Sequence, residues 1–152
     1  MEVEILPFMG VSVAGMEYTG TDPEGIVQLW TDFVQQADGI PGKYPEDDGY
    51  GILMDYDPET GDFTYMAGTA WSGEGELPRG MTSVEIGSGT YAVFTFEFDM
   101  VDEIYGFVYD EWLPVSGWVR GGGCDFEYYP EEFVPSDEGV LMQLYVSVEE
   151  AE

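Results

Sequence analysis

Residues 21–39 read TDPEGIVQLWTDFVQQADG, and this stretch decides the fold. Thr21 or Asp22 can cap a helix, and a proline followed by an acidic residue suits its first turn. Apolar residues then recur at intervals of three and four, which is typical of an amphipathic helix: Ile26, Leu29, Trp30, Phe33 and Val34. The stretch ends in Asp38-Gly39, a helix stop. The sequence therefore predicts one helix here, with a single apolar face.

The segments on either side of this helix have the pattern of strands. Residues 3–18 are apolar, rich in β-branched side chains and interrupted by glycines, which indicates a strand with a bulge or kink. Residues 50–56 and 63–71 flank the turn-forming sequence DPETGD and predict a hairpin. Although the aspartates and glutamate around this turn resemble a calcium loop in composition, the glycine and the terminal glutamate of such a loop are missing.

The same order of elements returns in the rest of the chain. Residues 81–98 form a long extended run broken by Gly-Ser-Gly, and apolar spacing predicts a second helix over 101–112, stopped at Leu113-Pro114. Residues 125–129 and 140–148 read as strands, with a loop at 130–139 between them. The chain thus repeats a strand-helix-strand-strand unit, and the repeat lies in the pattern of elements rather than in identity.

These patterns predict an α+β fold built as a pseudo-twofold duplication. We expect residues 1–152 to form a single domain, with a first half of about 1–75 and a second of about 76–152. Each half alone would be a three-stranded sheet with one helix packed on one face and the other face uncovered. Pairing the halves gives an antiparallel sheet with both helices on one face and a ligand groove between the halves.

Charge and composition exclude several classes of function. The 152 residues include 32 acidic and 3 basic ones, for a net charge of −29, and no histidine. So few cations make direct nucleic-acid binding improbable. Without histidine, a Ser-His-Asp or Cys-His mechanism and a His-based zinc site are excluded, and we expect no metal or cofactor.

Other features bear on location. Cys124 is the single cysteine, so no disulfide can form within the chain, which fits a reducing compartment. No apolar run is long enough to span a bilayer. We therefore expect a cytoplasmic protein that does not enter membranes. The acidity has two explanations: it keeps the surface solvated, above all in a salt-rich cytoplasm, or it attracts cationic ligands.

Five short motifs, in order, carry a resemblance to a known superfamily. They are Tyr50-Gly51-Ile52, Leu77-Pro78-Arg79-Gly80-Met81, Gly89-Thr90-Tyr91-Ala92-Val93-Phe94, Glu111-Trp112-Leu113-Pro114 and Asp125-Phe126-Glu127-Tyr128-Tyr129. With the order of elements, they resemble the effector-binding domain superfamily. This superfamily includes the ligand domains of AraC- and MerR-type multidrug regulators, the gyrase-inhibitory-protein-like family and stand-alone integron cassette proteins.

The resemblance implies an aromatic groove that binds cationic amphipathic molecules, with one glutamate facing the cation. By motif this glutamate is Glu127, and the family's tyrosine on the last strand is Tyr145. Ser147 stands where the family usually has proline. Because the first expected strand begins at the first methionine, we expect no helix-turn-helix region. We therefore expect that the chain is not a complete transcription factor of the regulator type.

Further aromatic residues on the expected elements are candidates for the same groove. Alternation places Asp125, Glu127 and Tyr129 on one face of their strand and Phe126 and Tyr128 on the other. The remaining candidates for ligand contact, each of which could equally be core, are Tyr50, Trp71, Tyr91, Phe96 and Trp112.

Three functions remain open at this stage. The first is a stand-alone binding module for organic cations, with a separate regulator or target protein as a candidate partner. In the second, the chain hydrolyses reactive electrophiles with Glu127 as general base, but no second catalytic group is evident, so an enzyme is the less favoured hypothesis. In the third, the acidic surface mimics DNA and inhibits a cationic protein.

Overall fold

The predicted α+β class is confirmed by a computed structural model, which describes residues 2–22, 24–44, 49–57, 59–123, 125–130 and 141–151. The elements, in chain order, are β1 (Glu2–Phe8), β2 (Val11–Gly20), α1 (Glu24–Gln36), η1 (Ala37–Gly39), β3 (Gly49–Tyr56), β4 (Phe63–Ala70), β5 (Thr82–Ile86), β6 (Gly89–Glu97), η2 (Phe98–Met100), α2 (Val101–Gly106), η3 (Phe107–Trp112), α3 (Leu113–Val115), β7 (Trp118–Arg120), β8 (Phe126–Tyr129) and β9 (Leu141–Glu150).

The strands form one sheet in the order β1-β6-β9-β8-β3-β4-β2-β5, and β7 pairs with β9 beside this path. The pairings are antiparallel. The first half contributes β3-β4-β2 and the second half β8-β9-β6, and the two halves meet where β3 pairs with β8. This arrangement is the expected duplication of one unit, with its junction in the middle of the sheet.

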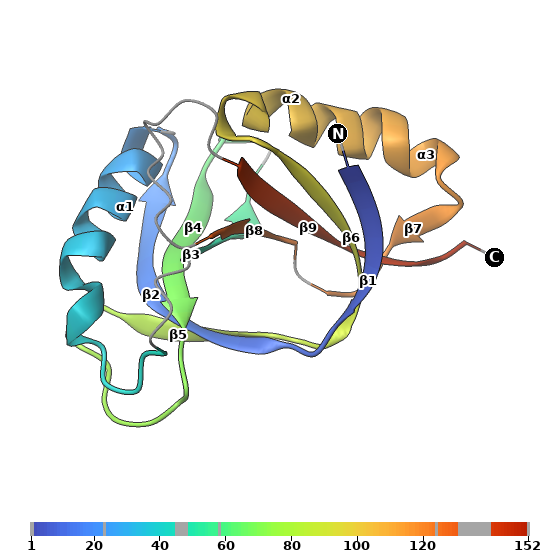
Figure 1. The fold of residues 1–152 in the computed structure, drawn as a ribbon. Helices are drawn as coiled ribbons and strands as arrows, with labels where there is room; N and C mark the ends of the chain where they lie inside the picture. The colour runs from blue at the N-terminus through green and yellow to red at the C-terminus, as the bar shows by residue number, and fades with distance from the viewer. Residues whose placement is uncertain are drawn as a thin grey trace.

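The two long extended runs are each two strands rather than one. The first is divided at Gly10, whose φ of 94° turns the chain between β1 and β2. The second is divided at Gly87-Ser88, between β5 and β6. As a result β1 pairs with β6 of the other half, and β5 pairs with β2. Figure 1 shows both runs crossing at the bottom of the molecule, so each half supplies an edge strand to the other.

Both helical regions lie where the sequence predicts them, with two corrections. The helical region that begins at Val101 does not stop at Leu113-Pro114 but continues as a π-helix (η3) and a short α3 through Val115. Pro114 is tolerated because it occupies the first turn of α3, where a missing N–H costs nothing. The short strand β7, which follows α3, is not predicted by the sequence pattern. The predicted hairpin turn is present: Asp57 N–H donates to the Asp62 carbonyl at 2.8 Å. The loop expected at 130–139 lies outside the described residues, apart from Pro130.

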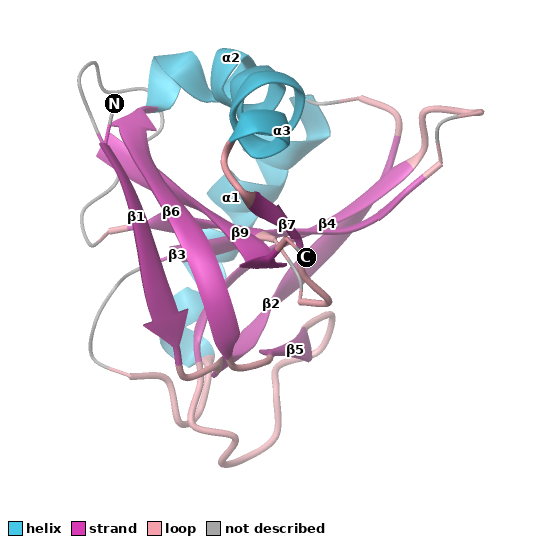
Figure 2. Ribbon diagram, turned by 90° about the vertical axis from the view of Figure 1, so that its right-hand side faces the viewer, coloured by secondary structure: helices cyan, strands magenta, loops and turns pink. Residues whose placement is uncertain are grey.

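The two faces of the sheet bury different cores. On one, here called the helix face, Ala67 packs with Leu29 and Phe33 of α1, and Phe94 packs with Ile104 of α2 and Val108 of η3. Figure 1 shows α1 beside β2 and β4, and Figure 2 shows α2 and α3 above the strands. On the other, the opposite face, one aromatic core gathers Phe8, Tyr50, Tyr91, Phe126, Tyr128 and Tyr145. Among the described residues no helix has the length and apolar character needed to cross a membrane.

Candidate functional site

Glu127 lies near the centre of the sheet on the helix face. It is in β8, where it pairs with Gly51 of β3 on one side and Leu144 of β9 on the other. Glu127 is only 8% exposed to solvent, which is unusual for a glutamate. Since β3 belongs to the first half and β8 to the second, Glu127 stands at the junction of the halves.

Three tyrosine hydroxyls donate hydrogen bonds to the Glu127 carboxylate. The Tyr65 and Tyr129 hydroxyls reach Oε1 at 2.8 and 2.6 Å, and the Tyr105 hydroxyl reaches Oε2 at 2.6 Å. The indole N–H of Trp30 in turn donates to the Tyr65 oxygen at 3.1 Å. We call these five residues the Glu127 cluster. Short bonds to a charged acceptor are the strong class of hydrogen bond, so the cluster fixes the orientation of the carboxylate.

Both halves of the chain supply the cluster. Trp30 comes from α1 and Tyr65 from β4, whereas Tyr105 comes from α2 and Tyr129 from β8. The Trp30 and Tyr129 rings meet edge to face across the junction, with centroids 5.1 Å apart. The carboxylate is therefore enclosed by aromatic rings from both helices and from the sheet between them.

Two glycines of β3 make room for this arrangement. A Cβ atom on Gly51 would lie 2.0 Å from the Tyr65 hydroxyl and 2.6 Å from Glu127 Oε1. A Cβ atom on Gly49 would lie 3.0 Å from the Trp30 ring. A side chain at position 51 would thus occupy the space in which the tyrosine and the carboxylate meet.

Burial and the Glu127 charge act together on the tyrosines. Desolvation raises the pKa of Tyr65, Tyr105 and Tyr129 well above the ordinary value, and the adjacent Glu127 charge raises it further. The phenols therefore keep their protons at neutral pH and remain hydrogen-bond donors. Chemically, the site offers a fixed negative charge inside a wall of neutral aromatic rings.

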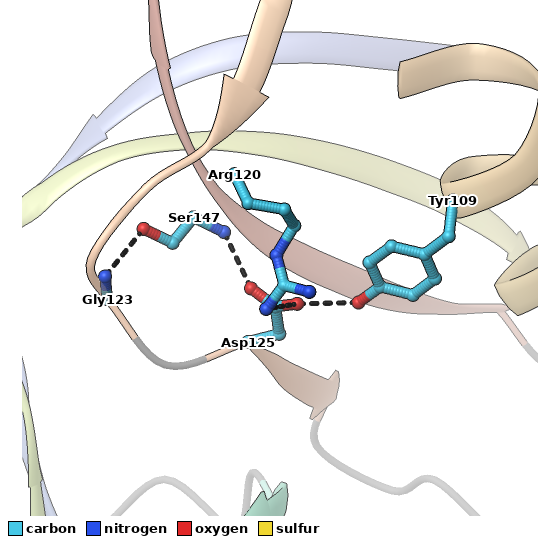
Figure 3. Close-up of polar contacts among 5 residues, drawn as sticks. All are labelled: Tyr109, Arg120, Gly123, Asp125 and Ser147. Atoms are coloured by element: carbon cyan, nitrogen blue, oxygen red, sulfur yellow. Dashed lines mark hydrogen bonds and ion pairs between the residues drawn. The ribbon is translucent and has the colours of Figure 1, made fainter. Parts of the chain in front are cut away.

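A second carboxylate, that of Asp125, lies two residues before Glu127 in the chain, and Figure 3 shows its contacts. Its Oδ2 accepts a hydrogen bond from the Tyr109 hydroxyl at 2.5 Å and pairs with the Arg120 guanidinium at 2.8 Å. Its Oδ1 accepts the backbone N–H of Ser147 at 2.9 Å, and the Ser147 hydroxyl accepts the backbone N–H of Gly123 at 2.9 Å. Ser147 thus ties Asp125 to β9.

Three of the aromatic residues that sequence predicts for the site are not brought together with Glu127. Tyr145 pairs with Phe126, the neighbour of Glu127, and Tyr50 pairs with Tyr128, so both point to the opposite face. Tyr91 packs with them in the same core. Alternation along a strand is the reason, because neighbours of Glu127 in sequence or register face away from it. These three tyrosines therefore lie on the face opposite Glu127, and their contact with a ligand remains a prediction.

The other predicted residues have varied surroundings. Phe96 and Trp112 lie on the helix face, where Phe96 is buried and Trp112 meets Phe94 edge to face at 5.0 Å. Trp71 follows the end of β4, and its indole N–H donates to the Pro41 carbonyl at 2.6 Å. It lies four residues beyond the position that pairs with Gly51, which is about 13 Å along the strand.

The residues that complete the cluster were only partly visible in the sequence. Tyr129 shares the face of Glu127 by alternation, and Tyr65 and Trp30 are aromatic residues on expected elements. Tyr105 gave no such signal, since its helical spacing is equally that of a core residue.

Elsewhere, a hollow of about 330 Å³ lies between the kinks of the two long runs, formed by residues 9–12 and 85–88. It contains no member of the Glu127 cluster. Within the described ranges no group of three or more acidic or thiol side chains is arranged to hold a metal ion.

Comparison with known proteins gives a family and a fold. Residues 5–148 match the family described as integron-associated effector binding protein (Cass2). The transcriptional regulator BrlR of Pseudomonas aeruginosa is 32% identical over 97% of this chain and 56% of its own length. A DNA gyrase inhibitor of Erwinia billingiae is 36% identical over 51% of this chain and 52% of its own. The chain spans about half the length of these relatives.

Among solved structures, that of SAV2435 bound to tetraphenylphosphonium superimposes with a TM-score of 0.70. It is 15% identical in sequence, and the match covers 98% of this chain and 94% of that one. A likeness at this identity shows the fold alone. The match over nearly the whole chain and the doubled unit around a central junction lead to one conclusion: the protein is an effector-binding module of the Cass2 integron-associated family.

Proposed function

We propose that this module binds aromatic or amphipathic organic cations at the Glu127 cluster, with Glu127 as the countercharge. The observation that carries the proposal is a buried carboxylate whose polar partners, in the part of the chain described, are three neutral hydroxyls. A charge held away from water is costly unless it is paired. A lipophilic cation that enters between the rings supplies the missing positive charge.

The surrounding rings favour the same class of ligand. Aromatic faces attract cations by about 0.5–2 kcal/mol each, more when water is excluded. The rings of Trp30 and Tyr105 are only partly buried, so they are candidates for this contact. The tetraphenylphosphonium in the related fold of SAV2435 belongs to the proposed ligand class. Ligand contact by Phe96, Trp112, Trp71, Tyr50, Tyr91 and Tyr145 remains a prediction.

Calorimetric titration with tetraphenylphosphonium tests the proposal. We expect the wild-type protein to bind it and Glu127→Gln, which keeps the shape of the side chain but removes its charge, to bind at least about tenfold more weakly, a difference of about 1.4 kcal/mol. Quenching of tryptophan fluorescence, to which Trp30 contributes, gives an independent readout. The neutral triphenylphosphine oxide should bind weakly to both proteins.

The matched control is Glu103→Gln, which changes the net charge equally on an exposed position of α2. This variant should bind tetraphenylphosphonium as the wild type does. Equal affinity of the wild type and Glu127→Gln, with near-ultraviolet circular dichroism showing both to be folded, contradicts the proposal.

One alternative function has an observation behind it. The likeness to a DNA gyrase inhibitor and the net charge of −29 favour a cationic protein partner, with the acidic surface in place of DNA. Binding to a purified gyrase subunit that Glu127→Gln leaves intact and raised salt abolishes would support this alternative. A separate regulator protein is compatible with either function.

A further inference from the structure

The Asp125 carboxylate is a second negative group on the helix face, contributed by the residue directly before β8 and two residues before Glu127. Alternation puts both side chains on one side of the strand, with Cα atoms about 7 Å apart. Asp125 is largely buried, with 14% of its side chain exposed, whereas the Arg120 side chain that pairs with it is 51% exposed. A mostly buried anion thus meets a cation that comes from the solvent side.

Stacked rings connect the two carboxylates. Tyr105 and Tyr109 lie one helical turn apart, with centroids separated by 6.3 Å and planes inclined by 19°. The hydroxyl of Tyr105 donates to Glu127 and that of Tyr109 donates to Asp125. Each carboxylate therefore has a tyrosine ring beside it, and the two rings form a continuous aromatic surface between the charges.

Arg120 occupies the position that a cationic ligand would take at Asp125. Its guanidinium carbon lies 5.1 Å from the centroid of the Tyr109 ring, within the range of cation–π attraction, while its Nη2 contacts Asp125 at 2.8 Å. Figure 3 shows the guanidinium beside the Asp125 carboxylate, which the Tyr109 hydroxyl also contacts. These are the interactions proposed for a ligand at Glu127: a carboxylate on one side and an aromatic face on the other.

Arg120 reaches this position because of the β7 strand. The strand follows α3 and pairs with β9, and Arg120 is its last residue, opposite Val148. Only Lys43, Arg79 and Arg120 are basic in the whole sequence. One of these three, Arg120, lies against Asp125, two residues from Glu127. The positive charge of Arg120 therefore acts directly on the charge of the site.

We propose that Asp125 and Tyr109 form a second cation subsite which Arg120 of the same chain fills, so that the protein prefers ligands with one positive charge to ligands with two. The inference rests on the proposed function of the Glu127 cluster and adds its charge specificity. With Arg120 in place, a second ligand cation meets a guanidinium. Without it, the second cation meets a carboxylate and an aromatic face.

Two dyes that share one ring system test the inference. Ethidium and propidium have the same phenanthridinium, but propidium has a second cationic centre on a trimethylene arm. We expect Arg120→Gln to bind propidium about five- to tenfold more tightly than the wild type does, with little change for ethidium. The measured quantity is the ratio of the two dissociation constants, from fluorescence titration of nucleic-acid-free protein.

Two further variants separate the subsite from general electrostatics. Arg79→Gln removes one positive charge, as Arg120→Gln does, but at an exposed position outside the subsite. It should leave the ratio of the two dissociation constants unchanged. Adding Asp125→Asn to Arg120→Gln should return the ratio to the wild-type value. Arg120→Lys should give a ratio close to that of the wild type, since it keeps the charge although it loses the planar stacking.

The outcomes distinguish this inference from the proposed function. An unchanged ratio in Arg120→Gln, while ethidium binding still depends on Glu127, overturns the second subsite alone. An equal gain in Arg79→Gln also overturns it, because the effect is then long-range. If neither dye binds the wild type or Arg120→Gln, the proposed function fails for these cations, and the second subsite fails with it.

Discussion

At the scale of single residues, the Glu127 cluster depends on the absence of a side chain at position 51. The Tyr65 hydroxyl and Glu127 Oε1 both lie where a Cβ atom of residue 51 would stand. Gly51 pairs with Glu127 across the β3–β8 junction, so the space cannot be recovered by moving one strand without disturbing the other. Glycine is thus required at position 51 by the contacts a Cβ atom would make and not by a positive φ. This indicates that the close approach of Tyr65 to Glu127 depends on it.

Gly51→Ala should therefore separate the tyrosine from the carboxylate. We expect the free energy of unfolding in urea to fall by at least about 1.5–3 kcal/mol, the value of a hydrogen bond to a charged group. Gly89→Ala is the control on another strand, since its Cβ would lie 3.9 Å from Tyr91, an ordinary contact. Equal stability of Gly51→Ala and the wild type would show that the cluster does not need this space.

The alkaline titration of the tyrosines gives a second prediction for the residues of the cluster. Tyr65, Tyr105 and Tyr129 have a pKa raised above the ordinary value of about 10 in the folded state. The folded protein holds these protons to higher pH than the unfolded chain does. Their contribution to stability is thus complete below about pH 10 and is lost as pH rises above it.

Tyrosinate absorbance of the folded protein should consequently show a late phase that is missing in urea. Replacing any one of the three by phenylalanine should reduce the amplitude of this phase, and unfolding of the wild type should become easier above about pH 10. Coincident titration curves for folded and urea-unfolded protein would refute the raised pKa values.

The residue scale also shows what the sequence could and could not predict. The motif and alternation were enough to put Glu127 and Tyr129 on one face. Tyr105 was not predictable, because its contact depends on how α2 packs over the sheet. Tyr50 and Tyr145 were candidates without an assigned face, because their motifs identify their strands, while the register of those strands against β8 is a property of the folded sheet.

At the scale of elements, the β8–β9 pair is held by a contact that a proline cannot make. The Ser147 backbone N–H donates to Asp125 Oδ1, and its hydroxyl accepts the Gly123 N–H. Proline, the residue that the resemblance to the superfamily leads us to expect here, lacks the N–H. In this chain the bond ties Asp125, the residue directly before β8, to β9 and orients the carboxylate that pairs with Arg120.

Ser147→Pro should lower the free energy of unfolding by about 1.5–3 kcal/mol, because it removes a donor to a charged acceptor from within a strand. Ser147→Ala keeps the N–H and loses only the hydroxyl acceptor, so its loss should be about 0.5–1.5 kcal/mol. Urea unfolding of both variants measures the difference. A proline variant as stable as the alanine variant would mean that the Asp125 contact contributes nothing.

Elements were predicted well where their patterns are local and poorly where packing decides. The periodicity of residues 101–112 identified a helix, but not the π-helical η3 or the continuation through Pro114. Glycines in the long runs indicated kinks, but not that each kink sends a strand to the other half. Exchange of edge strands requires both halves to be present, and no single segment contains that information.

At the scale of the whole molecule, the net charge of −29 acts on stability and on binding in opposite directions. Carboxylates spread over one small domain repel one another and oppose folding, while the same potential attracts cations to the site. Salt screens both effects, since the Debye length falls from about 10 Å at 0.1 M to about 3 Å at 1 M.

Raising sodium chloride from about 0.05 to about 0.5 M should therefore stabilise the fold and weaken the ligand complex. We expect the thermal midpoint to rise by at least about 3 °C, which corresponds to about 1 kcal/mol for a domain of this size. Over the same range the affinity for tetraphenylphosphonium should fall. Near the isoelectric point of about 4.1 the salt dependence of the midpoint should disappear. A flat midpoint at neutral pH would show that the carboxylates are too well solvated to repel one another, and a parallel gain in both quantities would show that salt acts through hydrophobic burial instead of charge.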